Sequence, residues 1–554
     1  MTTLAEAVGR TLADSGVRHA FGVVGGGNIL ATAALTAAGV HYTAARHEGG
    51  AMAMADAHFR ATGEVAICTT THGPGFTNAL TALADAAKHG SGVVLLCGDA
   101  PLTGRRAHDV DQSALLAALD VAVVRLADPA TALADTAAAV RTARERRMPV
   151  AVLLPGDLID RPLPVPDTAD APAGLPETTA RAAAGPDERE LAAALDALSR
   201  ARRPLILGGL GAWHAGAGKV LGELGDRLGA LFATTVMAGG LFRDSPWSLG
   251  VCGGFAAPRA AALMGEADVV VAFGASLDTF TLHGGRILDP AATVVQVDLN
   301  AGARAARTDL MVRGDAHTVA VRLLDAVGER RPAAADWRDR RAGAVAEARA
   351  GWAEVRHDDA STGARIDPRT LTRALAELLP EERTVVLDGG HFIAWPAMYW
   401  PVPDPAGFVF TGAAFQSIGL GLAGAVGAAV GRPDRLTVVA AGDGGALMGL
   451  PELDTLVRSG RPALVVVYDD AAYGFEEHMY LPRGADPATT SFTDTDFATV
   501  ARGLGAAAVT VRRTADLDAV RDWQAAGRPG TLVLDCKVLP GVVAPFLADL
   551  LGRA

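Results

Sequence analysis

Short apolar runs alternate with helical stretches along most of this 554-residue chain. In the first part of the sequence the strand-like runs are Ala20–Val24, Val65–Thr69, Val93–Cys97 and Pro149–Leu154. Buried strands that are separated by helices form parallel sheets, because each strand needs a crossover connection to run beside its neighbour in the same direction. The sequence therefore predicts an α/β protein with mostly parallel sheets.

Two polar stretches divide this alternation into three consecutive α/β domains. We predict a first domain over residues 1–160, a linker rich in Pro, Ala and Thr over 161–185, a central domain over 186–330, a helical connector rich in Arg and Ala over 331–365, and a third domain over 366–554. The central domain has strand-like runs at Pro204–Gly208, Ala267–Phe273 and Thr293–Asp298. Three domains agree with the length, which predicts about three or four.

Composition excludes several classes of function. The net charge is −12 and there is no basic tract, so nucleic acid is not an expected partner. No apolar run reaches the length of a membrane span, and the N-terminus begins with an amphipathic helix rather than a signal-peptide core. The four scattered cysteines are typical of buried, reduced thiols. These features predict a cytoplasmic protein that does not bind membranes.

The most informative local pattern is a pair of acidic residues that follow neighbouring strand-like runs. Leu436–Ala441 leads into Gly442-Asp443-Gly444-Gly445, and after a helical stretch at Ala446–Ser459 the run Ala463–Tyr468 leads to Asp470. Such a unit places the C-terminal ends of both strands side by side, so both carboxylates are expected to face one crevice. Hard oxygen ligands beside a glycine turn suit Mg²⁺ that carries a diphosphate. Two ordinary surface turns are the alternative interpretation.

This pattern resembles the signature of the thiamine-diphosphate enzymes, in which Gly-Asp-Gly is followed after one such unit by a pair of Asn residues. The resemblance implies that Asp443, Asp470 and the backbone carbonyl of Ala472 bind the metal. Both Asn positions are Asp in this chain. Asp470 still offers an oxygen ligand. Asp469 adds a negative charge near the diphosphate, which is unfavourable unless that carboxylate is hydrogen-bonded or turned away.

A second motif, near the N-terminus, supports the resemblance. The strand-like run His41–Ala45 is followed by Glu48 and by a helical stretch that reaches Thr62. In the family, a glutamate at this place faces the aminopyrimidine ring of the cofactor, so Glu48 is implied to be catalytic. Taken alone, Glu48 is better explained as a solvated residue that the helix dipole favours, and it is the downstream motif that favours the catalytic interpretation.

Further matches extend the resemblance over essentially the whole chain and indicate the acetolactate synthase-like branch, which also contains benzaldehyde lyase, 2-hydroxyacyl-CoA lyase and several 2-oxo acid decarboxylases. They imply a pyrimidine-binding domain, a central Rossmann-like domain and a diphosphate-binding domain. The other residues implied to be catalytic or to line the substrate pocket are Gly26, His72, Gln112 and Glu476. Those implied to contact the cofactor are Gly389, Gly390, His391, Ile418, Gly442, Gly444, Gly445, Ala472 and Tyr473.

The pocket residues indicate different reactions. Gly26 leaves room for a second substrate and favours carboligation, whereas Glu476 matches an acid that assists decarboxylation or protonation. His72 is either a proton relay or a turn residue. The reaction expected from the resemblance is decarboxylation of a 2-oxo acid and ligation of the acyl carbanion to a second carbonyl. The alternatives are simple 2-oxo acid decarboxylation and the lysis of a 2-hydroxyacyl-CoA or 2-hydroxyketone.

Two further alternatives belong to other classes. A non-catalytic, cofactor-binding paralogue would not need the proton relay that Glu48 implies. A nucleotide-dependent dehydrogenase built on the glycine turns does not account for Glu48, Asp443 and Asp470 together. The cluster Gly208–Ala212 after a strand hints at a nucleotide pocket, but a tight turn explains it equally well, so FAD, ADP and CoA stay undecided.

The proposed cofactor site is split between the ends of the chain. The first domain carries Glu48, and the third carries the metal and diphosphate residues. In the family these halves come from two subunits. The resemblance therefore implies a homodimer with the active site at the subunit interface, and a dimer of dimers, a homotetramer, is plausible.

Overall fold

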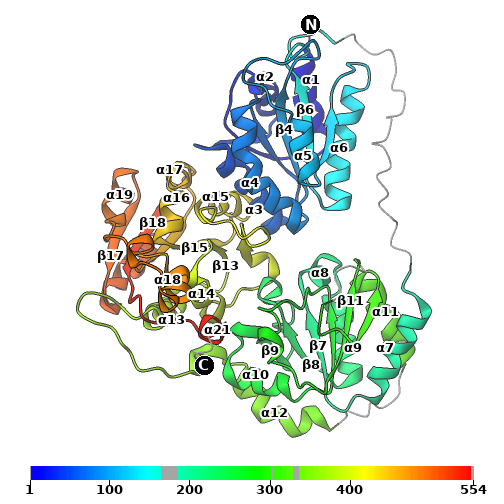
Figure 1. The fold of residues 1–554 in the computed structure, drawn as a ribbon, viewed down its shortest axis with the longest axis vertical. Coiled ribbons are helices and arrows are strands. Elements are labelled where there is room, and N and C mark those ends of the chain that lie inside the picture. Colours follow the sequence, from blue (N-terminus) through cyan, green and yellow to red (C-terminus); the bar gives the residue numbers. More distant parts are fainter. Residues whose placement is uncertain (1, 164–184, 301–304, 329–335, 551–554) are drawn as a thin grey trace.

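Three α/β blocks follow one another along the chain, and Figure 1 shows each as a sheet covered by helices. The computed structural model describes residues 2–163, 185–300, 305–328 and 336–550; most of the predicted linker and the first residues of the predicted connector lie outside these ranges. Each block contains a six-stranded sheet, and the named strands of each sheet pair in parallel. The predicted α/β fold with parallel sheets is confirmed.

The first block has the strand order β2-β1-β3-β4-β6-β5. Its strands are β1 (His19–Gly22), β2 (His41–Ala44), β3 (Ala66–Thr70), β4 (Val93–Asp99), β5 (Ala122–Arg125) and β6 (Val150–Pro155). Its helices are α1 (Leu4–Asp14), α2 (Ile29–Ala37), α3 (Glu48–Thr62), α4 (Pro74–His89), α5 (Gln112–Ala118) and α6 (Ala132–Arg146). The central strands β3 and β4 are buried along their whole length, as expected where helices cover both faces of a parallel sheet.

The central block has the order β12-β11-β10-β7-β8-β9, which is the doubly wound order of a Rossmann fold. Its strands are β7 (Pro204–Gly208), β8 (Leu231–Thr234), β9 (Ser248–Val251), β10 (Val269–Phe273), β11 (Thr293–Asp298) and β12 (Leu310–Arg313). Its helices are α7 (Glu188–Arg200), α8 (Leu210–His214), α9 (Gly218–Leu228), α10 (Pro258–Gly265) and α11 (Ala316–Val327). Helix α12 (Trp337–Ala348) follows in the predicted connector and packs on α10.

The third block has the order β14-β13-β15-β16-β18-β17, which repeats the order of the first block. Its strands are β13 (Arg383–Leu387), β14 (Phe408–Phe410), β15 (Leu436–Gly442), β16 (Ala463–Asp469), β17 (Ala507–Val511) and β18 (Thr531–Lys537). Its helices are α13 (Pro368–Leu378), α14 (Ala394–Tyr399), α15 (Gly421–Gly431), α16 (Asp443–Met448), α17 (Pro451–Arg458), α18 (Gly474–Tyr480), α19 (Phe497–Gly503), α20 (Asp518–Ala525) and α21 (Pro545–Leu550).

The helix after β15 differs from the sequence-based expectation. One helical stretch was predicted from Ala446 to Ser459, but the structure has two helices, α16 and α17. The break falls just before Pro451, which has no backbone N–H to continue the hydrogen-bond ladder of the first helix and begins the second one. The first helix also begins three residues earlier than predicted, so Asp443 lies in its first turn.

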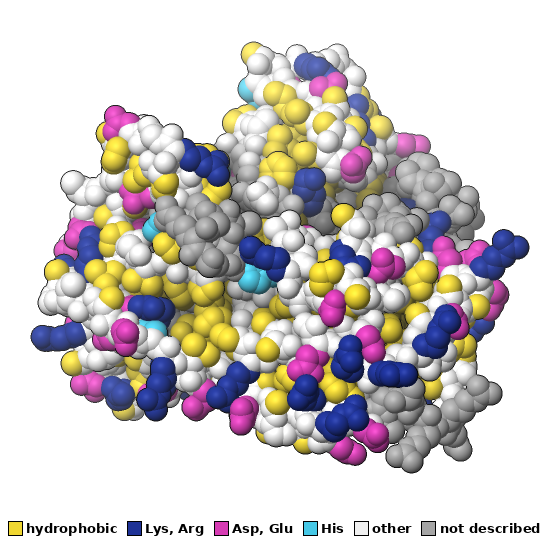
Figure 2. Space-filling view, turned by 60° about the horizontal axis from the view of Figure 1, so that its bottom comes forward, with side chains coloured by type: hydrophobic (Ala, Val, Ile, Leu, Met, Phe, Trp, Pro, Cys, Tyr) yellow, Lys and Arg dark blue, Asp and Glu magenta, His cyan; other side chains and the backbone are white. Residues whose placement is uncertain are grey.

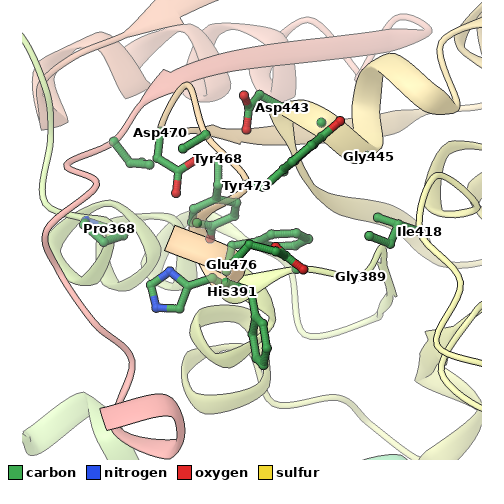
Figure 3. A pocket seen from close by; sticks show the side chains of 18 of the residues that line it. Pro368, Gly389, His391, Ile418, Asp443, Gly445, Tyr468, Asp470, Tyr473 and Glu476 are labelled. Atoms are coloured by element: carbon green, nitrogen blue, oxygen red, sulfur yellow. The ribbon is translucent and has the colours of Figure 1, made fainter. Parts of the chain in front are cut away.

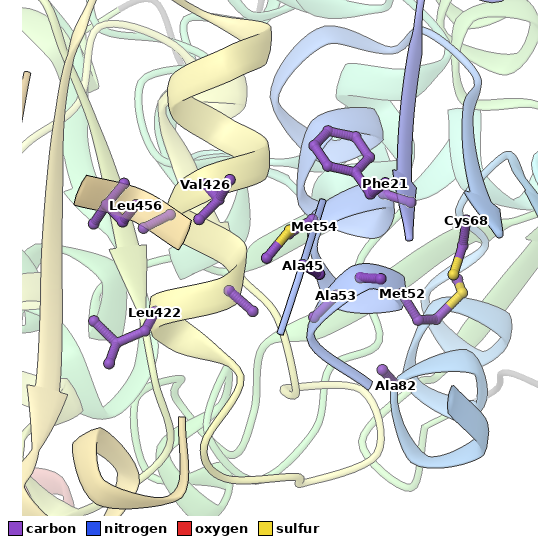
Figure 4. Close-up of a cluster of buried hydrophobic side chains, with 14 of the residues drawn as sticks. Phe21, Ala45, Met52, Ala53, Met54, Cys68, Ala82, Leu422, Val426 and Leu456 are labelled. Atoms are coloured by element: carbon purple, nitrogen blue, oxygen red, sulfur yellow. The ribbon is translucent and has the colours of Figure 1, made fainter. Parts of the chain in front are cut away.

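The first and third blocks share one hydrophobic core, in which α3 packs against α15. Figure 4 shows Met54 of α3 facing Val426 of α15, with Phe21 of the same cluster on the other side of Met54 in this view. The two helices approach so closely that a Cβ on Gly427 would lie 2.0 Å from the carbonyl oxygen of Met54, so this position requires glycine. All four cysteines are buried and free, as expected for small core residues.

The exposed surface carries both signs of charge. On the face shown in Figure 2, Lys and Arg side chains are intermixed with Asp and Glu side chains. Within the described ranges, no helix has both the length and the apolar character needed to cross a membrane.

Candidate active site

A cavity in the third block brings together the two acidic residues that the sequence singles out. Asp443 follows β15 and Asp470 follows β16, and these strands are paired so that Gly442 lies beside Tyr468. Both carboxyl groups point toward the cavity from its upper side in Figure 3. The C-terminal edge of the parallel sheet thus forms the crevice that the sequence predicts.

The two carboxyl groups are poorly solvated and repel each other. Burial, together with the nearby charge of Asp469, raises the pKa of Asp443 to about 6. Burial, together with the charges of Asp443 and Asp469, raises the pKa of Asp470 to about 8. Burial and like charge are the main causes of both pKa shifts, and a nearby positive charge would oppose them. A divalent cation would supply that charge, so the donor set fits Mg²⁺.

The loop after β16 is held in a constrained conformation. Ala471 has a left-handed backbone with φ of +58°, and its amide donates to Oδ1 of Asp469 over 3.0 Å. Ala472 pairs with Ser491 in an isolated antiparallel bridge, and the amide of Tyr473 donates to the carbonyl of Thr490 over 2.9 Å. The left-handed residue turns the chain at the cavity wall, where Ala472 is one of the lining residues.

The predicted glycines form close contacts around the cavity. A Cβ on Gly444 would lie 2.8 Å from the ring of Tyr473, so these two predicted cofactor contacts are in fact neighbours. Gly442, Gly389 and Gly390 also line the cavity, and Ile418 does so with 45 % of its surface exposed. In Figure 3 the Ile418 side chain lies on the side of the cavity opposite Asp470. An exposed isoleucine at a cavity wall is available to contact a bound ligand.

Asp388 is a residue that the sequence-based reasoning missed. Its buried carboxylate accepts hydrogen bonds from the amides of Gly389, Gly419 and Gly421 over 2.7, 2.8 and 3.2 Å. A Cβ on Gly445 would lie 2.9 Å from its Oδ2 atom. Asp388 therefore ties the turn at Gly389 to the turn at Gly419–Gly421. The signal that could have found it is its place directly after a strand, which it shares with Asp443.

His391 connects the cavity to the C-terminal segment. Its Nε2 atom accepts a hydrogen bond from the amide of Ala544 over 2.9 Å, and its ring centroid lies 4.7 Å from that of His478. Burial and the neighbouring His478 lower the pKa of His391 to about 3, so the ring is neutral at neutral pH.

Glu476, on α18, also lines the cavity. Figure 3 shows Glu476 and His391 on the side opposite Asp443.

Glu48 begins α3 in the first block, and contacts on both sides fix its position. Its carboxylate accepts a hydrogen bond from Nδ2 of Asn78 over 3.0 Å. A Cβ on Gly75 would lie 3.2 Å from its Oε1 atom and 2.8 Å from Cγ2 of Thr71. Glu48 and Thr71, which precedes the predicted residue His72, therefore both lie against Gly75.

Glu452, in the third block, holds the turn that precedes Glu48. This buried carboxylate accepts hydrogen bonds from the backbone amides of Arg46 and His47 and from the hydroxyl of Thr455. A Cβ on Gly50 would lie 2.3 Å from Oε1 of Glu452. No local pattern in the sequence indicates this contact, because the partners lie 405 positions apart in the chain.

The other predicted site residues of the first block are Gly26, His72 and Gln112, which lie close together but differ in their exposure to solvent. A Cβ on Gly26 would meet no atom within 4 Å, so space is open there. Nε2 of His72 lies 3.0 Å from Nε2 of His108, a second histidine that the sequence-based reasoning did not single out. Gln112 is buried, accepts from the amide of Gly73 and donates to the carbonyl of Gly98. Its amide therefore bonds to the backbone and supports the glycine turns.

The cavity beside Asp443 is lined by the third block. Among the described residues, those that line it all fall between Pro368 and Val542, and none comes from the first block. The two blocks nevertheless meet within one copy of the chain, because α3 packs against α15 and Glu452 holds the turn before Glu48.

The glycine-rich turn of the central block is explained by packing. A Cβ on Gly209 would lie 2.1 Å from the carbonyl oxygen of Gly274, and one on Gly211 would lie 2.7 Å from the Cα atom of Gly274. The turns after β7 and β10 therefore approach each other at backbone distance. These glycines give no separate support for FAD.

Three family models match successive parts of the chain. Residues 2–119 match the N-terminal TPP binding domain of thiamine pyrophosphate enzymes, residues 191–323 match their central domain, and residues 388–536 match their C-terminal TPP binding domain. The matches follow the three sheets in order.

Several curated proteins are similar over nearly the full length. A putative acetolactate synthase large subunit of Mycobacterium tuberculosis is 30% identical over 540 residues, which covers 93% of each chain. The large subunit of acetolactate synthase isozyme 3 of Escherichia coli is 27% identical and covers 94% of this chain and 91% of its own. A sulfoacetaldehyde acetyltransferase of Rhodobacter capsulatus is 28% identical and covers 100% of this chain and 97% of its own.

Proposed function

Because the chain belongs to the thiamine pyrophosphate enzymes, in their acetolactate synthase-like branch, we propose that it decarboxylates a 2-oxo acid and joins the acyl group to a second carbonyl compound. The observation that carries this proposal is the pairing of a buried Asp443–Asp470 site in the third block with Glu48 in the first. When bound, thiamine diphosphate supplies the electron sink that stabilises an acyl carbanion.

Each half of the site has its own task. Asp443, Asp470 and the carbonyl oxygen of Ala472 would hold Mg²⁺ on the diphosphate, since a cation would offset the burial and like charge that raise the pKa values of both carboxyl groups. The glycine turns tied together by Asp388 would let the diphosphate approach the backbone. Glu48, oriented by Asn78, would hydrogen-bond the pyrimidine ring and favour its transfer of a proton.

The residues near the substrate pocket support carboligation, and some of them would also serve simple decarboxylation or lysis. The open space beside Gly26 gives room for a second substrate. Glu476, at the cavity wall, would serve protonation steps, which a simple decarboxylase or a lyase also needs. His72, paired with His108, would relay a proton. Gln112 would act by supporting the turn at Gly73.

We propose a homodimer as the smallest active unit, and a dimer of dimers as the complete assembly. Its support is that the lining of the Asp443 cavity, among the described residues, contains none from the first block. A two-fold axis would place the first block of each copy beside the third block of the other. Glu48 of one copy would then complete the cavity of the other.

A turnover assay tests this function. The purified protein, with thiamine diphosphate and Mg²⁺, is given pyruvate and then a series of other 2-oxo acids, and CO₂, acetolactate and acetaldehyde are measured. We expect CO₂ together with a ligated product. Acetaldehyde as the sole organic product from pyruvate would favour the simple decarboxylase. Cofactor binding with no turnover of any 2-oxo acid would contradict the proposal and favour the lyase or a non-catalytic role.

A further inference from the structure

Asp469 occupies the place where the family signature has its first asparagine, and this carboxylate is fully buried. Its Oδ1 atom accepts the amide of Ala471 over 3.0 Å, and its Oδ2 atom lies 2.5 Å from Nζ of Lys537. Its backbone carbonyl accepts from the amide of Val538 and from the guanidinium of Arg365, each over 2.9 Å. Asp469 is thus hydrogen-bonded on both carboxylate oxygens, which resolves the objection to its charge.

Lys537 comes from the neighbouring strand. It is the last residue of β18 and lies directly beside Asp469 in the register of the sheet. Its side chain is 3% exposed, and Nζ contacts the carbonyl of Thr495 over 2.5 Å and Oδ1 of Asp535 over 2.8 Å. Asp535 precedes it by two positions on the same strand, so both side chains lie on one face of the sheet.

The charges of this cluster bear on the cofactor site because Asp469 is next to Asp470 in the chain. Without a cation beside it, Asp469 would be a third buried carboxylate near the position of the diphosphate, and removal of one partner from a buried ion pair is strongly unfavourable. An asparagine at this place would carry no charge. The pair of Asp469 and Lys537 also carries none in sum, and the negative charge that is left in the three-residue cluster belongs to Asp535, on the neighbouring strand.

We propose that Lys537 is a positioning residue of the cofactor site, which neutralises Asp469 so that the ion pair replaces the uncharged asparagine of the family signature. The inference rests on the proposed function, since it assumes that a diphosphate binds beside Asp470. Asp469 then shapes the loop through the amide of Ala471, and Lys537 makes its charge compatible with an anionic ligand. The two residues are expected to depend on each other.

Three variants separate this role from a merely structural one. Lys537→Met removes the cation, Asp469→Asn removes the anion, and the double variant removes both. Asp535 loses its cation equally in Lys537→Met and in the double variant. The difference between these two therefore reports the charge of Asp469 alone. Asparagine at 469 can still accept the amide of Ala471, so the turn is retained.

The readouts are the affinity for thiamine diphosphate at fixed, saturating Mg²⁺, by titration calorimetry, and the melting temperature of the cofactor-free protein in EDTA. We expect Lys537→Met to weaken thiamine diphosphate binding about tenfold or more, and the double variant to recover to within about threefold of Asp469→Asn. We also expect the melting temperature to fall in Lys537→Met and to recover in part in the double variant.

A double variant that binds as weakly as Lys537→Met would overturn the proposal, as would a Lys537→Met variant that binds like wild type. If Lys537→Met does not fold, the proposal still requires the double variant to fold and to bind the cofactor, and failure of either overturns it. Wild-type protein that binds no thiamine diphosphate would instead overturn the proposed function. The melting temperatures would then test the ion pair on its own.

Discussion

The backbone amide of His47 donates to the buried carboxylate of Glu452 over 2.9 Å, so a residue of the third block holds the turn that presents Glu48. Glu452→Ala would leave the amides of Arg46 and His47 without their acceptor. We expect the free energy of unfolding to fall by about 2–3 kcal/mol, with a lower kcat. Glu452→Gln keeps one acceptor and should lose about half as much. Urea unfolding checks this; unchanged kcat and stability in Glu452→Ala would contradict the role.

Glu48→Gln should abolish most turnover while leaving cofactor binding nearly intact. The amide cannot exchange a proton with the pyrimidine ring, and such groups contribute about 10²–10⁴-fold to rate. The measurements are kcat for the best 2-oxo acid and the dissociation constant of thiamine diphosphate. Glu64→Gln, an exposed change just beyond the other end of α3, is the matched control and should behave like wild type. Equal losses of kcat in Glu48→Gln and Glu64→Gln would instead show a general effect on helix α3.

The cofactor-free protein should lose stability as pH rises, because the pKa values of Asp443 and Asp470 are raised in the folded state. Between their ordinary value near 4 and these raised values, the folded state binds more protons than the unfolded state, so the free energy of unfolding decreases with pH. In EDTA we expect the melting temperature to fall from about pH 5 to about pH 8. Mg²⁺ with thiamine diphosphate should remove this fall, and Asp470→Asn should reduce it. A flat profile in EDTA would contradict the raised values.

Two inactive variants should restore activity when they share a dimer. Glu48→Gln damages one half of the site and Asp443→Asn the other, so a mixed dimer has one intact site and one doubly damaged site. With random pairing, coexpression should give about a quarter of wild-type activity. Separately purified variants, mixed without exchange of subunits, are the control. Activity that stays absent in verified mixed dimers would show that each site is built from one chain.

Gly26 and Gly27 are adjacent glycines that differ in the space around them, so the same substitution can be compared at both positions. A Cβ on Gly26 meets open space, whereas one on Gly27 would lie 2.8 Å from Nδ1 of His72 and 3.1 Å from the Cα atom of Gly98. Gly26→Ala should keep the unfolding free energy and reduce the ratio of ligated product to free aldehyde. Gly27→Ala should cost about 1–3 kcal/mol of stability. Thermal unfolding and product analysis check both, and equal stability losses would contradict the open space beside Gly26.

The sequence was sufficient for the fold because its signals are local. Apolar runs bounded by turns located β7, β11, β15 and β16 to within a residue or two, and their alternation with helices required parallel pairing. The family matches confirm the thiamine diphosphate resemblance that Glu48 and Asp443 first indicated. The break before Pro451 was missed because the apolar pattern continues across it.

Contacts between distant segments could not be predicted. Glu452 and His47 lie in different blocks, and no periodic pattern links them. Asp388 follows a strand as Asp443 does, but only the fold shows that the amides of two glycine turns converge on it. The sequence showed that Asp469 brings a negative charge to the site, but it did not show which residue balances that charge. Lys537 lies beside Asp469 through the register of β16 and β18, and this register cannot be read from a single sequence.

The shared core of α3 and α15 has a consequence for synthesis on the ribosome. Roughly 360 residues separate Thr62, where α3 ends, from Gly421, where α15 begins. At the usual elongation rates this is a delay on the order of 20–70 s, during which the first domain has no partner for the apolar side of α3. The nascent chain is therefore a predicted client of chaperones. Truncation before residue 421 should yield a fragment that aggregates, although its own sheet is complete.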